Sequence, residues 1–168
     1  MKVLLAAIRS LLASLRLLAW CVMITVPTQR FGAVTRPNED VLTFPSGIFG
    51  FELNLHWLFL GDRSHGGLYW LQNVEDGSLS LPVADPRELV QGYALDVQRR
   101  QLASIWRGTE QLIVLSVLTE YDGRLCLNLR NPIVINPQRQ VGAQVVVADQ
   151  QPLQYALPAQ SVSLRKSA

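Results

Sequence analysis

The feature that most constrains this chain is a pair of apolar runs joined by Asp122-Gly123, in the stretch GTEQLIVLSVLTEYDGRLCLNL. Asp-Gly between two runs rich in β-branched residues and leucine is the strongest short-range signal for a tight β-hairpin. In the second run, leucines from Leu125 onward alternate with Cys126 and Asn128, so that the leucines share one face of a strand. A chain organised around such a hairpin is expected to form an antiparallel sheet.

Three more hairpins are predicted by similar signals. Asp76-Gly77 separates the apolar residues 69–73 from 79–83, and a longer glycine-rich loop divides NLHWLFLGDRSHGGLYWL. In VINPQRQVGAQVVVA, Asn136-Pro137 fits the first two positions of a type I turn. Eight to ten short strands at regular spacing predict an all-β fold, either a sandwich or a single antiparallel β-barrel-like domain with one or two short helices.

The stretch NLRNPIVINP places an apolar triplet, residues 133–135, between two Asn-Pro steps. Proline has no backbone donor and biases the residue before it toward extended geometry, so Asn131 and Asn136 should be extended or lie in turns. Because a central strand rarely tolerates proline, the triplet is expected to form a short strand at a sheet edge or corner.

Two segments carry helix signals. DPRELVQG has Asp85 as the N-cap, Pro86 at the first helical position, Glu88 at the capping-box position and Gly92 as a stop, which predicts a single turn. DVQRRQLASIWRG, residues 96–108, predicts a helix of about ten residues with one apolar face, and so short a helix must pack on the sheet.

The composition fits one globular domain. The chain has 168 residues, 49% of them hydrophobic, only two cysteines and a formal net charge of +2, which indicates neither a disulfide framework nor a nucleic-acid binder. We expect residues 23–158 to form the β domain and residues 159–168 to form a polar flexible tail.

Residues 1–22 contain three basic residues at seven-residue spacing and no acidic residue. The uncharged runs between them are too short for a transmembrane span or a signal-peptide core. We interpret this segment as sequence upstream of the true start at Met23. A basic amphipathic interfacial helix is the alternative, in which residues 1–22 would anchor a membrane-associated or exported β-rich binding domain.

The sequence contains no recognisable catalytic or metal-binding pattern. His56 and His65 lack ligand-type neighbours at metal-binding spacing, and Cys126 is interpreted as a packed structural thiol. SHGGL is unaccompanied by a nucleophile elbow, and there is no phosphate loop or dinucleotide fingerprint. These observations favour a binding domain that is not an enzyme and has no metal or other cofactor.

Four stretches occur in an order and at separations that are specific in combination: LTFPSGIFGFE, YWLQNVEDGSLSLPVADP, LIVLSVLT and LNLRNPIVIN. Together they resemble the flagellar assembly factor FliW family, over residues 24–158. The resemblance implies a cytoplasmic, non-enzymatic, β-barrel-like protein with two alternative partners. These are flagellin, bound through the C-terminal part of the unassembled monomer, and CsrA, the translational repressor of flagellin mRNA. It implies no direct nucleic-acid contact and no membrane partner.

The resemblance further implies a partner switch: export of flagellin frees the protein to bind CsrA, so that flagellin synthesis resumes. The candidate partner-binding residues in the matched motifs are Phe49, Phe51, Glu52, Asp85, Pro86, Asn128, Asn131, Pro132 and Asn136. For each of these aromatic and proline residues, core packing or turn geometry is the competing interpretation. The chain departs from the family pattern at Arg130 and Asn131, and in the glutamine-rich segment 138–160.

Overall fold

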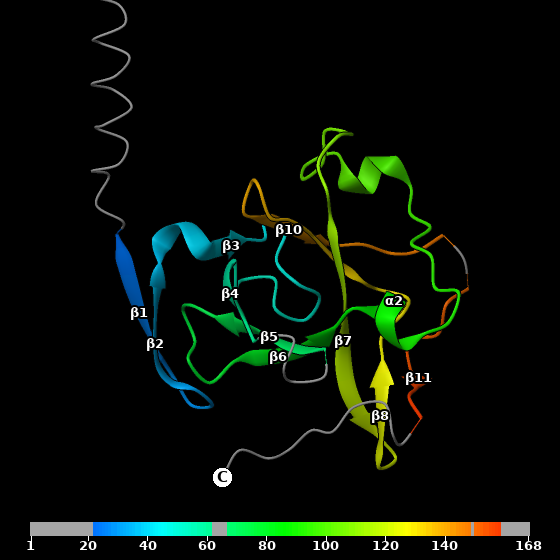
Figure 1. Ribbon diagram of the computed structural model, residues 1–168, viewed down its shortest axis with the longest axis horizontal. Helices are drawn as coiled ribbons and strands as arrows, with labels where there is room; N and C mark the ends of the chain where they lie inside the picture. The colour runs from blue at the N-terminus through cyan, green and yellow to red at the C-terminus, as the bar shows by residue number, and fades with distance from the viewer. Residues whose placement is uncertain (1–21, 62–66, 149, 159–168) are drawn as a thin grey trace, which may run out of the picture.

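The computed structural model describes residues 22–61, 67–148 and 150–158 (Figure 1). Its strands are β1 Met23–Thr28, β2 Gly32–Pro37, β3 Val41–Thr43, β4 His56–Leu60, β5 Leu68–Asn73, β6 Ser80–Ala84, β7 Ile113–Tyr121, β8 Arg124–Leu127, β9 Ile133–Asn136, β10 Val141–Gln144 and β11 Tyr155–Ala156. Its helical turns are the 3-10 helices η1 Asn38–Asp40 and η3 Arg99–Leu102 and the α-helix α2 Pro86–Leu89.

Seven of the strands close into a barrel, in the order β7-β6-β5-β4-β3-β10-β9, and the pairing of β9 with β7 completes the ring. Neighbouring strands are antiparallel except for β3 and β10, which are parallel. Strands β8 and β11 extend the sheet beyond β7, and β1 and β2 form a separate hairpin. The structure therefore confirms the predicted all-β, barrel-like domain with few and short helices.

The hairpin at Asp122-Gly123 is confirmed. Tyr121 pairs with Arg124 across a two-residue turn, and both turn residues have positive φ, 50° at Asp122 and 69° at Gly123. A type I′ turn requires this geometry at both central positions, which is why Asp-Gly suits it. The strands on either side of Asp76-Gly77 also pair as predicted, although a longer loop, residues 74–79, joins them.

The Asn-Pro segment forms the corner that the sequence predicts, and not a sheet edge. Strands β8 and β9 pair with successive parts of β7, and residues 128–132 connect them. Strand β9 pairs with both β7 and β10, and all four of its residues are buried. The central position is possible because Pro132 and Pro137 lie just outside the strand, so neither removes a donor from the ladder. The expected turn at Asn136-Pro137 is present, since the side-chain oxygen of Asn136 accepts hydrogen bonds from the backbone N–H groups of Gln138 and Arg139.

The single turn predicted at DPREL is confirmed as α2, where the Asp85 carboxylate accepts a hydrogen bond from the N–H of Arg87 at 2.9 Å. The longer helix predicted for residues 96–108 is wrong, because only Arg99–Leu102 is helical, as a 3-10 turn. Its apolar residues still pack inward in a cluster with β9 and β10. Tertiary packing therefore overrides the weak helical preference of so short a segment.

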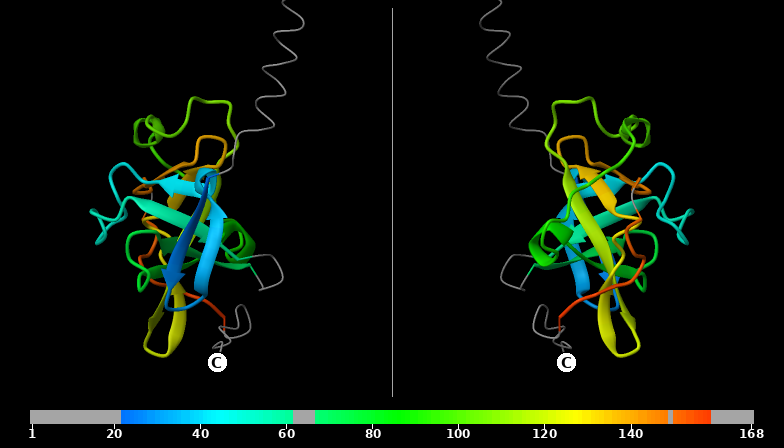
Figure 2. Two further views of the ribbon diagram at one scale, coloured as in Figure 1. Left: turned by 90° about the vertical axis from the view of Figure 1, so that its left-hand side faces the viewer. Right: turned by 90° about the vertical axis from the view of Figure 1, so that its right-hand side faces the viewer.

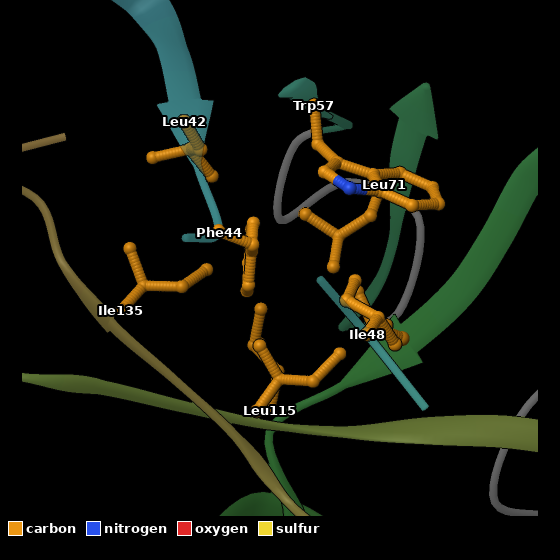
Figure 3. Close-up of a cluster of buried hydrophobic side chains, with 9 residues drawn as sticks. Leu42, Phe44, Ile48, Trp57, Leu71, Leu115 and Ile135 are labelled. Atoms are coloured by element: carbon orange, nitrogen blue, oxygen red, sulfur yellow. The ribbon is translucent and has the colours of Figure 1, made fainter. Parts of the chain in front are cut away.

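The barrel interior is a continuous apolar core (Figure 3). Its fully buried members include Phe44, Trp57, Leu71 and Leu115, which come from segments far apart in the sequence. Gly142 on β10 faces this core, and a Cβ there would lie 2.5 Å from the Phe44 ring. The core fixes the positions from which the surface loops project.

The β1–β2 hairpin packs on the outside of the barrel. Val26 is buried against Leu58 and Leu60 of β4, and the tip of the hairpin contacts the β5–β6 loop where Gln29 donates a hydrogen bond to the Gly77 carbonyl at 3.0 Å. None of the turn signals in the sequence predicts this hairpin. The interpretations of residues 1–22 and 159–168 concern segments that lie outside the described residues, apart from Val22. No helix within the described ranges is long and apolar enough to cross a membrane.

Candidate partner-binding surface

The most exposed large apolar side chain in the described part of the chain lies on the β3–β4 loop, residues 44–55. Leu53 is 95% exposed, and Phe49 on the same loop is 53% exposed. Figure 2 shows this loop, in cyan, projecting from the body of the barrel on the side away from α2. Large apolar groups held in solvent next to polar neighbours are typical of protein-binding surfaces.

Backbone hydrogen bonds make this loop compact. Phe51 donates to the Ile48 carbonyl at 2.7 Å, and Asn54 donates to the Phe51 carbonyl at 3.1 Å. Gly47 has a φ of 68°, and a Cβ at that position would lie 2.4 Å from the Glu52 Cα, so only glycine allows the chain to pass so closely. The loop is thus built to hold one conformation.

Two inward-facing side chains anchor the loop to the core. Ile48 is buried, and the half-buried Phe51 packs edge-on against Trp57 with ring centroids 6.4 Å apart. With these residues directed inward, Phe49 and Leu53 are left on the outside. Of the two phenylalanines that the sequence predicted for partner binding, Phe49 is therefore available at the surface, and Phe51 serves mainly as an anchor.

Glu52 closes the tip of the loop. Its carboxylate accepts a hydrogen bond from the Gly50 N–H at 2.9 Å. This bond, followed by one from its own backbone N–H, holds the pKa of the Glu52 carboxyl below its ordinary value of 4.5. At neutral pH the tip is charged and locally ordered.

Gln144 on β10 joins this loop to the first Asn-Pro step. Its Oε1 accepts a hydrogen bond from the Phe49 N–H at 2.8 Å, and its Nε2 donates to the Asn131 carbonyl at 2.9 Å. The Asn131 N–H in turn donates to Oδ1 of Asn128 at 2.9 Å. Two motifs that are distant in the sequence, GIFGFE and NLRNP, thereby lie on one surface.

The surface continues past Gln144 to Val146, which is 39% exposed. Both backbone groups of Val146 bond the side chain of Gln101 on η3: the N–H donates at 2.9 Å, and the carbonyl accepts at 2.8 Å. We call the surface formed by Phe49, Glu52, Leu53, Asn131, Gln144 and Val146 the loop surface.

The remaining predicted residues serve the fold where they lie. Asp85 caps α2 and pairs with Arg87, a hydrogen-bonded contact that raises the pKa of the guanidinium, while Pro86 is buried. Pro132 is buried beside β9. Asn136 is fully buried, and its Nδ2 donates to the Ile105 carbonyl at 2.7 Å. The structure does not bring these four residues to the loop surface.

Sequence reasoning missed Leu53, Gln144 and Val146. Leu53 follows the GIFGFE motif directly but reads as the beginning of an apolar strand, so its exposure carries no local signal. The role of Gln144 depends on a contact across 95 positions of sequence. The glutamine-rich composition after residue 138 is the only hint that side-chain amides are used here.

Cys126 and His56, which were candidates for catalysis or metal binding in the sequence, make only common side-chain contacts. Cys126 is buried, with its Sγ 3.8 Å from the Arg124 carbonyl, and His56 contacts the Glu75 carboxylate through Nδ1. Within the described ranges, no group of three or more His, Cys, Asp or Glu side chains could hold a metal ion. His65 lies outside those ranges.

Comparison with known proteins shows the family to which the chain is similar. The family model described as FliW protein matches residues 25–157. The chain is 31% identical over 125 residues to the flagellar assembly factor FliW of Geotalea uraniireducens, a match covering 73% of this chain and 76% of that protein. It is 32% identical over 126 residues to the protein of the same name from Moorella thermoacetica, covering 73% and 80%.

A solved structure has the same fold. The crystal structure of a flagellar assembly factor FliW superposes with a TM-score of 0.74 at 22% sequence identity. The match covers 83% of this chain and the whole of that chain. The barrel architecture described above is therefore shared with an experimentally determined structure.

Proposed function

The chain belongs to the FliW family, and from this membership we propose that it is a flagellar assembly factor that binds unassembled flagellin and the translational repressor CsrA in turn. Its relatives are named for a role in flagellar assembly. We propose that export of flagellin leaves the protein free to bind CsrA, which relieves repression of flagellin synthesis. We place this switch in the cytoplasm, where flagellin is made.

The observation that carries the proposal is the exposure of Phe49 and Leu53 on a loop that hydrogen bonds hold in one conformation. Binding energy at protein interfaces concentrates in a few apolar or aromatic anchors, and anchors that are ordered before binding lose less entropy. Two large apolar side chains on an ordered loop are suited to an apolar groove or helix face on a partner.

A switch follows if both partners use these same anchors. Binding of one partner then excludes the other, and the free concentration of flagellin sets the fraction of the protein that is available to CsrA. No catalytic step is needed, because mass action alone converts loss of one partner into capture of the other.

Isothermal titration calorimetry with purified flagellin and CsrA from the same organism tests this proposal. Leu53→Asp and Phe49→Ala should each weaken binding of both partners by tenfold or more, since truncation of a central anchor costs about 2 kcal/mol. Tyr121→Ala is the matched control, because Tyr121 is 59% exposed on the β7–β8 hairpin. Absence of wild-type binding to either partner would refute the proposal.

A further inference from the structure

Four arginines gather on the lobe formed by residues 96–110 and the adjoining β9–β10 turn, which Figure 1 shows rising above the barrel. They are Arg99, Arg100, Arg107 and Arg139, and all four are exposed. The lobe holds together because Nη1 of Arg139 donates to the Ser104 carbonyl at 3.3 Å. We call residues 96–110 with Arg139 the arginine lobe.

The guanidinium groups of this lobe are not neutralised by ion pairs. In the part of the chain that the structure describes, none of the four lies within ion-pair distance of a carboxylate. Arg99 instead lies over the Trp106 ring, 5.5 Å from its centroid. Their charge is therefore available to a partner.

The two acidic residues of the lobe offset only part of this charge, because the lobe carries four arginines. The Glu110 carboxylate accepts hydrogen bonds from the N–H groups of Arg107 at 3.0 Å and Thr109 at 3.4 Å. Hydrogen bonds from its own N–H and from that of Arg107 lower the pKa of the Glu110 carboxyl, so it stays ionised but is turned to the backbone. Asp96 is the other acidic residue of the lobe.

The other residues that the structure describes have a net negative charge. The lobe carries four arginines and two acidic residues, whereas the other described residues carry five arginines and nine acidic residues. An acidic partner would therefore be attracted to the lobe more strongly than to the rest of the described surface, which favours one orientation and raises its association rate.

We propose that the arginine lobe binds an acidic peptide segment of the protein partner that seats on the loop surface. The two surfaces are continuous, because Gln101 of η3 bonds both backbone groups of Val146. Guanidinium groups bind carboxylates through paired hydrogen bonds, which suits them to such a segment. The inference rests on the proposed function and adds the chemistry of the partner, which would combine an apolar groove or helix face for Phe49 and Leu53 with an acidic segment beside it.

Single-stranded RNA fits this lobe less well. Proteins that bind single strands stack bases on exposed aromatic rings, and Trp106 is the only aromatic residue of the lobe. The Arg99 guanidinium already lies over the Trp106 ring, and the indole N–H donates a hydrogen bond to the Glu110 carbonyl at 3.0 Å. The lobe thus offers charge without a stacking platform.

The test compares the full-length wild-type chain with the variant Arg100→Glu/Arg107→Glu. In the wild type, the side chains of Arg100 and Arg107 make no hydrogen bond or ion pair within the described ranges. The matched control is Arg30→Glu/Arg124→Glu, which makes the same change in net charge in the β1–β2 turn and the β7–β8 hairpin, away from the lobe. The probes are purified flagellin, purified CsrA, poly-L-glutamate and a single-stranded RNA of the flagellin leader, each at 50 and 300 mM salt. Circular dichroism confirms that all three proteins are folded.

We expect the lobe variant to bind at least one protein partner and poly-L-glutamate about tenfold more weakly at low salt, with a reduced salt dependence. The control should remain within about twofold of wild type. One outcome separates the two proposals: wild type binds no protein partner but does bind poly-L-glutamate, and the lobe variant does not bind poly-L-glutamate. The proposed function is then refuted, while the lobe remains assigned as a site for acidic peptides. Equal binding by wild type and the lobe variant, wild-type failure with all probes, or a loss confined to RNA would overturn the inference.

Discussion

The side-chain amide of Gln144 accepts a hydrogen bond from the backbone N–H of Phe49 at 2.8 Å, across 95 positions of sequence. Through this bond a barrel strand holds the loop that presents the exposed anchors. The same amide donates a hydrogen bond to the carbonyl of Asn131, so one side chain joins the GIFGFE and NLRNP segments of the loop surface. The barrel therefore orders the loop surface.

Replacement of Gln144 by alanine should loosen the loop. It leaves the Phe49 N–H and the Asn131 carbonyl without their partner, and we expect the free energy of unfolding to fall by about 1 kcal/mol. Amide hydrogen exchange at Phe49 should accelerate, and partner affinity should fall with it. Gln138→Ala is the control, because the Gln138 side chain is exposed on the β9–β10 turn. Unchanged exchange at Phe49 would contradict the role given to Gln144.

The order of the loop tip should depend on pH. Because the folded-state pKa of Glu52 lies below 4.5, its hydrogen bond to Gly50 is fully formed above that value and is lost as the pH falls through the folded-state pKa. Nuclear magnetic resonance should show the Gly50 amide shift following the titration of Glu52 at acidic pH. Glu52→Gln should remove this titration, and its persistence in that variant would assign the effect to another group.

Asn136 should matter for stability and not for partner choice. Its side-chain amide is fully buried, so Asn136→Ala leaves the buried Ile105 carbonyl and the part-buried N–H groups of Gln138 and Arg139 without their partner. We expect a loss of about 2 to 3 kcal/mol in the free energy of unfolding, measured by urea denaturation. Affinity of the folded fraction for each partner should stay within about twofold. A loss of binding without a loss of stability would assign Asn136 to the interface.

Gly77 should accept no side chain. A Cβ at this position would lie 1.9 Å from the carbonyl oxygen of Pro27, so Gly77→Ala must displace the β1–β2 hairpin from the barrel. Such overpacking costs about 1 to 3 kcal/mol. The readout is the amide of Gln29, which donates to the Gly77 carbonyl and should exchange faster in the variant. Wild-type exchange at Gln29 would show that the contact is not maintained in solution.

The parts of this fold that the sequence predicts are those with local causes. Asp122-Gly123 specifies its turn through backbone geometry, and Asp85-Pro86 specifies a helix start through capping. The Asn-Pro steps predict an edge or a corner for β9, because proline usually excludes a central position, yet both prolines lie immediately outside the strand and β9 is central. That one-residue distinction depends on the register with β7 and β10, which no local pattern contains.

The candidate surface also combines residues that the sequence predicts with residues whose position depends on tertiary contacts. The resemblance pointed to Phe49 and Asn131, but neither spacing nor composition could indicate that Gln144 joins them. Exposure of Leu53 likewise depends on how Ile48 and Phe51 turn into the core. The arginine lobe was visible only as Arg99-Arg100, because Arg107 and Arg139 join it through tertiary contacts.

The central claim is that one surface serves two partners, and a displacement titration tests it most directly. Labelled CsrA bound to the full-length protein is titrated with flagellin while the fluorescence anisotropy of CsrA is recorded. We expect flagellin to release CsrA completely, with an apparent affinity that weakens in proportion to CsrA concentration, and Leu53→Asp to bind each partner at least tenfold more weakly. A stable ternary complex, with CsrA retained at saturating flagellin, would contradict it.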